Sequence, residues 1–128
     1  MALGERRPTP PSDTITAVGV DHVRLSYLYA DDGDLEGLES LVHCAAQGEP
    51  LRATPAGGRS EVLDVLAPAE GPRGRHHLLR VIADGDCIAA VGRFTAAPAP
   101  AVEFADIFTI AADGLLLGCR RFYSVTPA

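Results

Sequence analysis

The sequence contains no lysine and no tryptophan, and the first of these absences excludes several kinds of chemistry. All eleven basic residues are arginine. Without a lysine amine the chain cannot form a Schiff base with a carbonyl substrate, and it cannot build the lysine-containing phosphate loop of many nucleotide-binding proteins. Enzymes that depend on a Schiff-base lysine or on a lysine-containing phosphate loop are therefore excluded.

Cysteine is also scarce, because the chain has only Cys44, Cys87 and Cys119, far apart and in apolar surroundings. An odd number of separated cysteines is typical of reduced thiols in a cytoplasmic protein. The N-terminal segment lacks an apolar signal core, and no apolar run is long enough to cross a bilayer. The net charge of −6 disfavours nucleic acid and anionic membranes. We therefore expect a cytoplasmic protein with no nucleic-acid or membrane partner.

The 128 residues suffice for one domain with one sizeable core. Residues 1–12, with three prolines, are predicted to be a disordered tail, and residues 13–128 a single domain. Asp13 or Thr14 is the expected cap of the first helix. Helices are predicted at 15–30, 35–43 and 61–66, a weak strand at 49–54, and further strands at 76–83, 87–96, 102–110 and 115–125. This order predicts an α+β domain with helices on one face of a mostly antiparallel sheet.

A carboxylate inside an apolar strand is the most informative feature of the sequence. Because side chains alternate along a strand, Phe104, Asp106, Phe108 and Ile110 share one face of the strand at 102–110. A carboxyl group among aromatic side chains loses water, which disfavours its charged form and is typical of a functional acid. The competing interpretation is a buried aspartate that is hydrogen-bonded only for structure.

Several short motifs occur in an order that resembles a known family. They are DDGDLEGL at 31–38, Gly58-Arg59, Asp84-Gly85-Asp86 and DIFTIAADG at 106–114. Together they resemble the nuclear transport factor 2-like superfamily, in particular its SnoaL-like polyketide cyclase and ketosteroid isomerase branches, over nearly all of residues 15–124. The resemblance implies a cone-shaped α+β barrel, in which about three N-terminal helices pack on a curved, mostly antiparallel sheet around an apolar pocket.

The resemblance also implies roles for single residues. Asp106 stands where ketosteroid isomerases place a protonated aspartic acid that donates to an oxyanion, and SnoaL-like cyclases use a pocket aspartate as acid or base. Two other isomerase groups are missing. The general-base aspartate falls near Pro50, beside Glu49, and the oxyanion tyrosine falls near Ser26, beside Tyr27. A steroid isomerase is therefore not expected.

Two adjacent histidines include a candidate base. His76 and His77 point to opposite faces of their strand, so one of them is expected in the pocket, and the sequence leaves open which. In a regular strand His76 shares its face with Leu78, Arg80 and Ile82, and His77 shares the other face with Leu79 and Val81. In scytalone dehydratase-like members of the fold, a histidine at this strand start and an aspartate at the position of Asp31 perform acid/base chemistry. The competing interpretations are a surface histidine and an aspartate that only ends the helix.

Further aromatic and charged residues complete the candidate site. Tyr27 is a candidate catalytic phenol, and the candidates for substrate contact are Tyr29, Phe104, Phe108 and Arg93. Packing of the aromatic rings and an ion pair for Arg93 are the competing interpretations. No metal site is expected, because adjacent histidines on a strand cannot share one ion. The strands also lack the Arg-x-Asp triplet of the limonene epoxide hydrolase branch.

These observations lead to two hypotheses of different classes. The first is an enzyme without a cofactor that cyclises, isomerises or dehydrates a hydrophobic, oxygenated small molecule, such as a polyketide or terpenoid intermediate, with Asp106 as general acid or base. The second is a non-catalytic ligand-binding or dimeric interaction module of the same fold. Replacing Asp106 with asparagine separates them, because only an enzyme loses turnover while it keeps its ligand. The resemblance also implies a homodimer formed through the outer sheet face.

Overall fold

The computed structural model describes residues 11–44, 59–68 and 73–124. Within these ranges three helices precede four strands, in the predicted order. The elements are α1 (Asp13–Asp32), α2 (Leu35–Ser40), α3 (Arg59–Leu66), β1 (Arg75–Asp84), β2 (Cys87–Thr95), β3 (Val102–Ile110) and β4 (Leu116–Tyr123). The predicted strand at 49–54 and nearly all of the predicted tail lie outside the described residues.

Helix α1 is closed at both ends by short-range hydrogen bonds. The Ser12 hydroxyl accepts from the backbone N–H of Ile15 at 3.2 Å, so the cap lies earlier than predicted. Gly33 ends the helix in the left-handed conformation, at a φ of 73°, and its N–H donates to the Ala30 carbonyl at 3.1 Å. The helix therefore carries Asp31 in its last turn.

The strands form one antiparallel sheet in the order β1-β2-β3-β4. On β3, buried and more exposed residues alternate, which confirms that Phe104, Asp106, Phe108 and Ile110 share the inner face. The register of β3 against β4 sets Asp106 directly opposite Arg121. Two groups of opposite charge thus meet on the inner face of the sheet.

A bulge in β1 changes which of its residues face inward. The register against β2 shifts between Leu78 and Arg80. The extra residue reverses the alternation, so His76 shares the inner face with Leu78 and Val81, whereas Arg80 and Ile82 face outward. The prediction that His76 shares a face with Leu78, Arg80 and Ile82 is therefore correct for Leu78 and wrong for Arg80 and Ile82.

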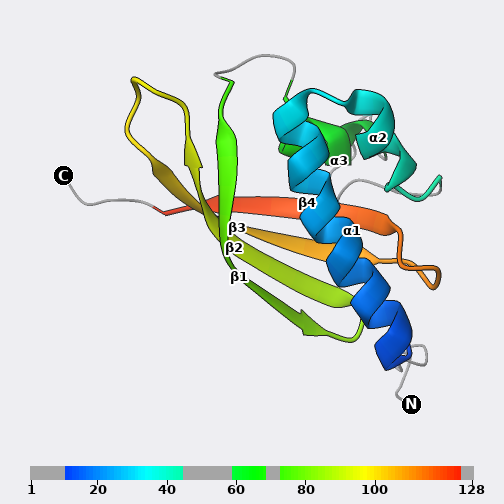
Figure 1. Ribbon diagram of the computed structural model, residues 1–128. Helices are drawn as coiled ribbons and strands as arrows, with labels where there is room; N and C mark the ends of the chain where they lie inside the picture. Colours follow the sequence, from blue (N-terminus) through cyan, green and yellow to red (C-terminus); the bar gives the residue numbers. More distant parts are fainter. Residues whose placement is uncertain (1–10, 45–58, 69–72, 125–128) are drawn as a thin grey trace.

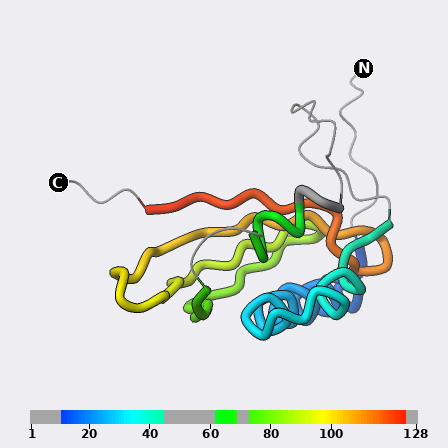
Figure 2. Tube along the Cα trace, turned by 90° about the horizontal axis from the view of Figure 1, so that it is seen from above, coloured from blue at the N-terminus to red at the C-terminus, as the bar shows by residue number. Residues whose placement is uncertain are grey.

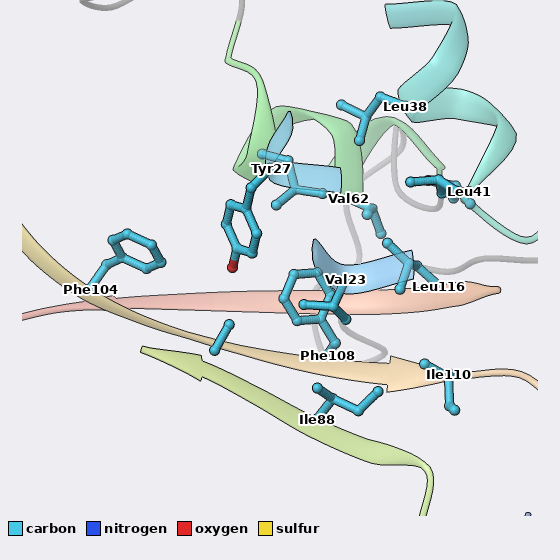
Figure 3. Packing of buried hydrophobic residues seen from close by; sticks show 13 residues of the cluster. Val23, Tyr27, Leu38, Leu41, Val62, Ile88, Phe104, Phe108, Ile110 and Leu116 are labelled. Atoms are coloured by element: carbon cyan, nitrogen blue, oxygen red, sulfur yellow. The ribbon is translucent and has the colours of Figure 1, made fainter. Parts of the chain in front are cut away.

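The helices lie on one side of the sheet. Helix α1 crosses the sheet obliquely (Figure 1), α1 and α2 lie on the same side of it (Figure 2), and α3 packs against α1, α2 and β4. Between the layers is a core to which both helices and strands contribute (Figure 3): Val23, Tyr27, Leu38, Leu41, Val42, Val62, Leu66, Ile88, Ala90, Phe104, Phe108, Ile110 and Leu116. This arrangement confirms the predicted α+β fold. In the described part of the chain, none of the helices has the length and apolar character needed to cross a membrane.

Candidate active site

A cavity of about 630 Å³ lies where the C-terminal ends of α1 and α3 meet the sheet. Its volume is in the range of small-molecule sites, roughly 300–1,000 Å³. All four strands contribute side chains, because β1 and β3 start at this end and β2 and β4 finish there. Apolar groups form much of the lining, and the charged or ionisable groups include Asp31, Arg73, His76 and Arg121.

Asp31 and His76 form a close pair in the cavity wall. Asp31 Oδ1 lies 2.6 Å from His76 Nδ1, and Asp31 Oδ2 accepts from the His76 backbone N–H at 2.8 Å. The side chains of His76 and Asp31 are 5% and 6% exposed. An ionised carboxylate only accepts hydrogen bonds, so Nδ1 carries the proton of this contact. The last turn of α1 thereby fixes the imidazole at the start of β1.

The other ring nitrogen of His76, Nε2, is buried and has no hydrogen-bond partner among the described residues. The rings of Tyr27, Phe94 and Phe104 surround the imidazole at centroid distances of 5.1, 4.9 and 5.4 Å. Burial lowers the pKa of His76 below its ordinary value of 6.5, although the hydrogen bond and the charge of Asp31 oppose this shift. His76 is therefore neutral at neutral pH and keeps a lone pair on Nε2.

Asp106 is fully buried, but its neighbours are not only apolar. Arg121 binds both of its oxygens, with Nε donating to Oδ1 at 2.7 Å and Nη2 donating to Oδ2 at 2.6 Å. The Tyr27 hydroxyl donates to Oδ2 at 2.5 Å, and Figure 3 shows this phenol pointing from α1 toward the sheet. Each of these partners is a donor, which suits an ionised carboxylate. Arg121 lines the cavity, whereas Asp106 lies behind it and is not part of the described lining.

Tyr27 and Arg121 are both held in their donating forms. Burial, and then the charge of Asp106, raise the pKa of the Tyr27 phenol above its ordinary value. Burial acts to lower the pKa of Arg121, but the hydrogen bonds and charge of Asp106 oppose burial and raise this pKa above its ordinary value. Arg121 also lies over the ring of Phe104, with its Cζ 4.5 Å from the centroid.

His77 and Arg93 lie opposite each other on the outer face of the sheet, away from the cavity. His77 is exposed, with its Nε2 3.2 Å from the Thr95 hydroxyl. The Arg93 side chain is 47% exposed and approaches Glu103 at 3.8 Å, the ion pair that was its competing interpretation. The strand alternation thus corrects the placement of both residues in the site. His76, not His77, is the histidine of the cavity wall.

The aromatic candidates differ in how close they come to the cavity. Phe104 contacts both the His76 ring and the Arg121 guanidinium. Phe108 is completely buried and meets the Tyr27 ring edge-on, with the centroids 6.1 Å apart (Figure 3). Tyr29 is half-buried and packs against the core cluster. Phe108 and Tyr29 are not part of the described cavity lining, so their contacts are those of packing.

Arg121 is the site residue that the sequence argument missed. A signal for it exists, because Arg120 and Arg121 are adjacent on a predicted strand and one of them must face inward. An inward arginine needs an acidic partner, and Asp106 stands on the inner face of the neighbouring strand. Finding the pair requires the register of β3 against β4, which no local pattern supplies.

The described residues do not form a metal site. No group of three or more histidine, cysteine, aspartate or glutamate side chains among them is arranged to hold a metal. The cavity wall instead contains the neutral imidazole of His76, its partner carboxylate Asp31 and the fixed guanidinium of Arg121.

Comparison with solved structures identifies the fold. The chain is similar to a proposed ketosteroid isomerase from Kribbella flavida, with 17% identity, a TM-score of 0.71, and 88% of this chain and 82% of that chain covered. It is similar to a proposed SnoaL-like polyketide cyclase from Jannaschia (18%, 0.66, 91% of each chain) and to an LEH-like epoxide hydrolase from M. tuberculosis (14%, 0.64, 85% and 84%). No family model and no curated protein matches the sequence. The chain therefore has the fold of the nuclear transport factor 2-like proteins, and that fold supports several activities.

Proposed function

We propose that the protein is a cofactor-independent enzyme that moves a proton on a hydrophobic, oxygenated small molecule bound in the cavity, with His76 as its acid/base group. The reaction class is cyclisation, isomerisation or dehydration. One observation carries the proposal: Asp31 holds one nitrogen of His76, and the other is buried without a partner among the described residues. An unpaired buried polar atom costs about 1–3 kcal/mol, so the arrangement fits a nitrogen whose partner is a ligand.

The geometry supports separate roles for His76, Asp31 and Asp106. Neutral His76 accepts a proton from the substrate through Nε2, and Asp31 stabilises the imidazolium that forms. The same nitrogen then returns the proton at another position. Because Asp106 already accepts hydrogen bonds from Arg121 and Tyr27 on its two oxygens, its part in this proposal is to hold Arg121 in place.

The test compares His76→Gln with His77→Gln, its neighbour on the outer face. Each protein is incubated in D2O with a panel of cyclic ketones and hydroxyketones, and NMR follows proton exchange and product formation. His76→Gln should lower the rate about 10²–10⁴-fold, the contribution of a positioned proton-transfer group. His77→Gln should keep the wild-type rate. A wild-type rate equal to that of buffer, or equal rates in wild type and His76→Gln, would refute the proposal.

A non-catalytic binding module is the second candidate function. The observation in its favour is Asp106, whose two oxygens already accept three hydrogen bonds, from Tyr27 and Arg121. Under this alternative, His76→Gln changes ligand affinity, and the wild-type protein accelerates no reaction of the panel. Calorimetry on the same compounds, next to the exchange assay, separates the two candidates.

We also propose that a second copy of the chain covers the outer sheet face. Helices α1 and α2 lie on the inner side of the sheet (Figure 2). On the outer face Ile82 and Phe122 are 53% and 50% exposed, next to the half-buried Val91 and Ile107. Exposed apolar side chains on a sheet face are typical of an interface, and the charged Arg80 and Arg93 lie on the same face. Sedimentation equilibrium should give the mass of a dimer, and Phe122→Glu should give that of a monomer; a wild-type monomer would refute this proposal.

A further inference from the structure

We propose that the substrate has two parts, an apolar body that enters the cavity and a phosphate-bearing arm that binds a cluster of cations beside the cavity mouth. The proposal rests on the proposed function for the apolar body, and it adds a second binding surface. The cations are Arg73, Arg75, His77 and Arg93, which we call the cationic corner. All four residues are exposed, and Arg73 also lines the cavity.

The charges of the chain are distributed unevenly between the helices and the sheet. The net charge is −6, and residues 13–40, which include α1 and α2, contain seven carboxylates and one arginine. Residues 73–124, which include the sheet, contain six arginines and five carboxylates. Three of these six arginines lie in the cationic corner. The corner is therefore a positive region on an acidic protein, and such a region attracts anions locally.

The register of β1 against β2 brings the cationic corner together. His77 lies directly opposite Arg93, and Arg75 lies opposite Thr95 on the same outer face. Neighbouring strands are about 4.8 Å apart, and residues two apart along a strand are separated by roughly 6.6 Å. The long arginine side chains can therefore reach one ligand together. Because Arg73 belongs to the cavity wall, the corner extends from the cavity mouth to the outer face of β1 and β2.

The described residues leave most of this positive charge without a partner. Arg73 and Arg75 form no ion pair with a carboxylate in the described part of the chain, and Arg93 approaches Glu103 only at 3.8 Å. When the His77 ring carries a proton, it and Arg93 are like charges directly opposite each other, which is destabilising. Charged side chains also protect edge strands such as β1, but Arg93 lies on the inner strand β2. Edge protection therefore does not explain the corner.

Phosphate groups fit the chemistry of the cationic corner. The planar guanidinium of arginine binds phosphate oxygens with two parallel hydrogen bonds. Several separated cations suit an arm with more than one phosphate, as in a nucleotide-linked thioester. The proposed dimer surface leaves room for this arm, because Ile82 lies farther along β1 from the cavity end and Phe122 lies on β4, the opposite edge strand.

The experiment compares two thioesters with the same apolar body. Phenylacetyl-coenzyme A carries a phosphate-bearing arm, and phenylacetyl-N-acetylcysteamine lacks the phosphates. The corner variant Arg75→Gln/Arg93→Gln removes two cations from the outer face. The control variant Arg24→Gln/Arg80→Gln removes the same charge from exposed positions outside the corner. Circular dichroism verifies the fold of each variant, and calorimetry measures the affinities at low and at high salt.

Wild type should bind the coenzyme A thioester more tightly than the short thioester, and high salt should reduce the difference. The corner variant should bind the coenzyme A thioester about 2- to 30-fold more weakly, the combined effect of two exposed ion pairs, and the short thioester as wild type does. The control variant should match wild type with both. A wild-type affinity for the coenzyme A thioester no higher than that of the corner variant, or an equal loss in the control, overturns the proposal.

The result for the arm is independent of the result for His76. If the corner variant loses affinity for the coenzyme A thioester, but wild type and His76→Gln exchange protons of the ketone panel at the same rate, the arm site stands and the proposed function fails. If His76→Gln slows this exchange, but the corner variant binds the coenzyme A thioester as wild type does, the proposed function stands and the arm site fails.

Discussion

Two carboxylates lie at the cavity end of the structure, each paired with a nitrogen-containing side chain, and the two pairs differ in which hydrogen-bonding atoms they leave without a partner. Asp106 and Arg121 satisfy each other with two hydrogen bonds, and Tyr27 adds a third. Asp31 satisfies only one side of the His76 ring, and Nε2 is left without a described partner.

This difference indicates that the Asp106–Arg121 pair stabilises the structure, whereas the Asp31–His76 pair can take part in a reaction. A buried ion pair held by two hydrogen bonds fixes geometry, and breaking it is costly because one charge is left uncompensated. The buried imidazole of His76 can still gain a hydrogen bond at Nε2, which has no partner among the described residues. We therefore place the scaffold function in the Asp106–Arg121 pair and the proton transfer in the Asp31–His76 pair.

The largest expected effect comes from Asp106→Asn. This change leaves the Arg121 charge in a nearly buried position without its partner, and it should lower the free energy of unfolding by about 3–5 kcal/mol. Urea denaturation measures the loss. The double variant Asp106→Asn/Arg121→Met should recover most of the stability, and a single variant as stable as wild type would contradict the scaffold role.

Asp31→Asn should affect activity more than stability. The amide retains an acceptor for Nδ1, but it cannot stabilise the imidazolium, so proton exchange of a cyclic ketone such as 2-tetralone should slow about 10²-fold. NMR in D2O measures the rate, and Asp34→Asn, a cap residue outside the cavity lining, is the matched control. An equal loss in both variants would assign Asp31 a structural role only.

Tyr27→Phe should have a moderate effect on stability. It removes one hydrogen bond to the charged Asp106, while both bonds from Arg121 remain. We expect a loss of about 1.5 kcal/mol in the free energy of unfolding, measured by urea denaturation. Tyr29→Phe is the control, and a loss as large at that position would show that the ring environment, not the bond to Asp106, is responsible.

The His76 pKa predicts a smaller, pH-dependent effect. Because burial lowers this pKa in the folded state below the value of 6.5, the unfolded ring binds a proton first as the pH falls. The unfolded state then holds more protons, so stability should decrease below about pH 6.5. Urea denaturation from pH 7.5 to pH 5 should show a steeper decline in wild type than in His76→Gln. Parallel curves would mean that the imidazole is not desolvated.

Much of the fold follows from local sequence patterns. The alternation from Phe104 to Ile110 predicts both the strand and its buried face, and Gly33 marks the end of α1 because it adopts a left-handed conformation there. These features depend on near neighbours in the chain. The order of helices and strands then favours a fold in which a layer of helices packs on one face of a sheet.

The candidate site follows from the sequence less completely. The burial of Asp106 is predictable, but its partner is not, because the contact with Arg121 depends on the register between two strands. The choice of His76 over His77 also needs the position of α1 above the sheet, and the bulge after Leu78 reverses the faces that a regular strand would have. Long-range register and bulges therefore limit what a single sequence can reveal here.

The most direct test of the account is the protonation state of His76, measured by ¹⁵N NMR of the imidazole nitrogens. We predict a neutral ring at pH 7 with its proton on Nδ1, and a titration midpoint below 6.5. The Asp31→Asn variant should lower this midpoint further, because the carboxylate opposes the effect of burial. A proton on Nε2 of the neutral ring, or a charged imidazole at pH 7, would contradict the assignment of His76 as the base.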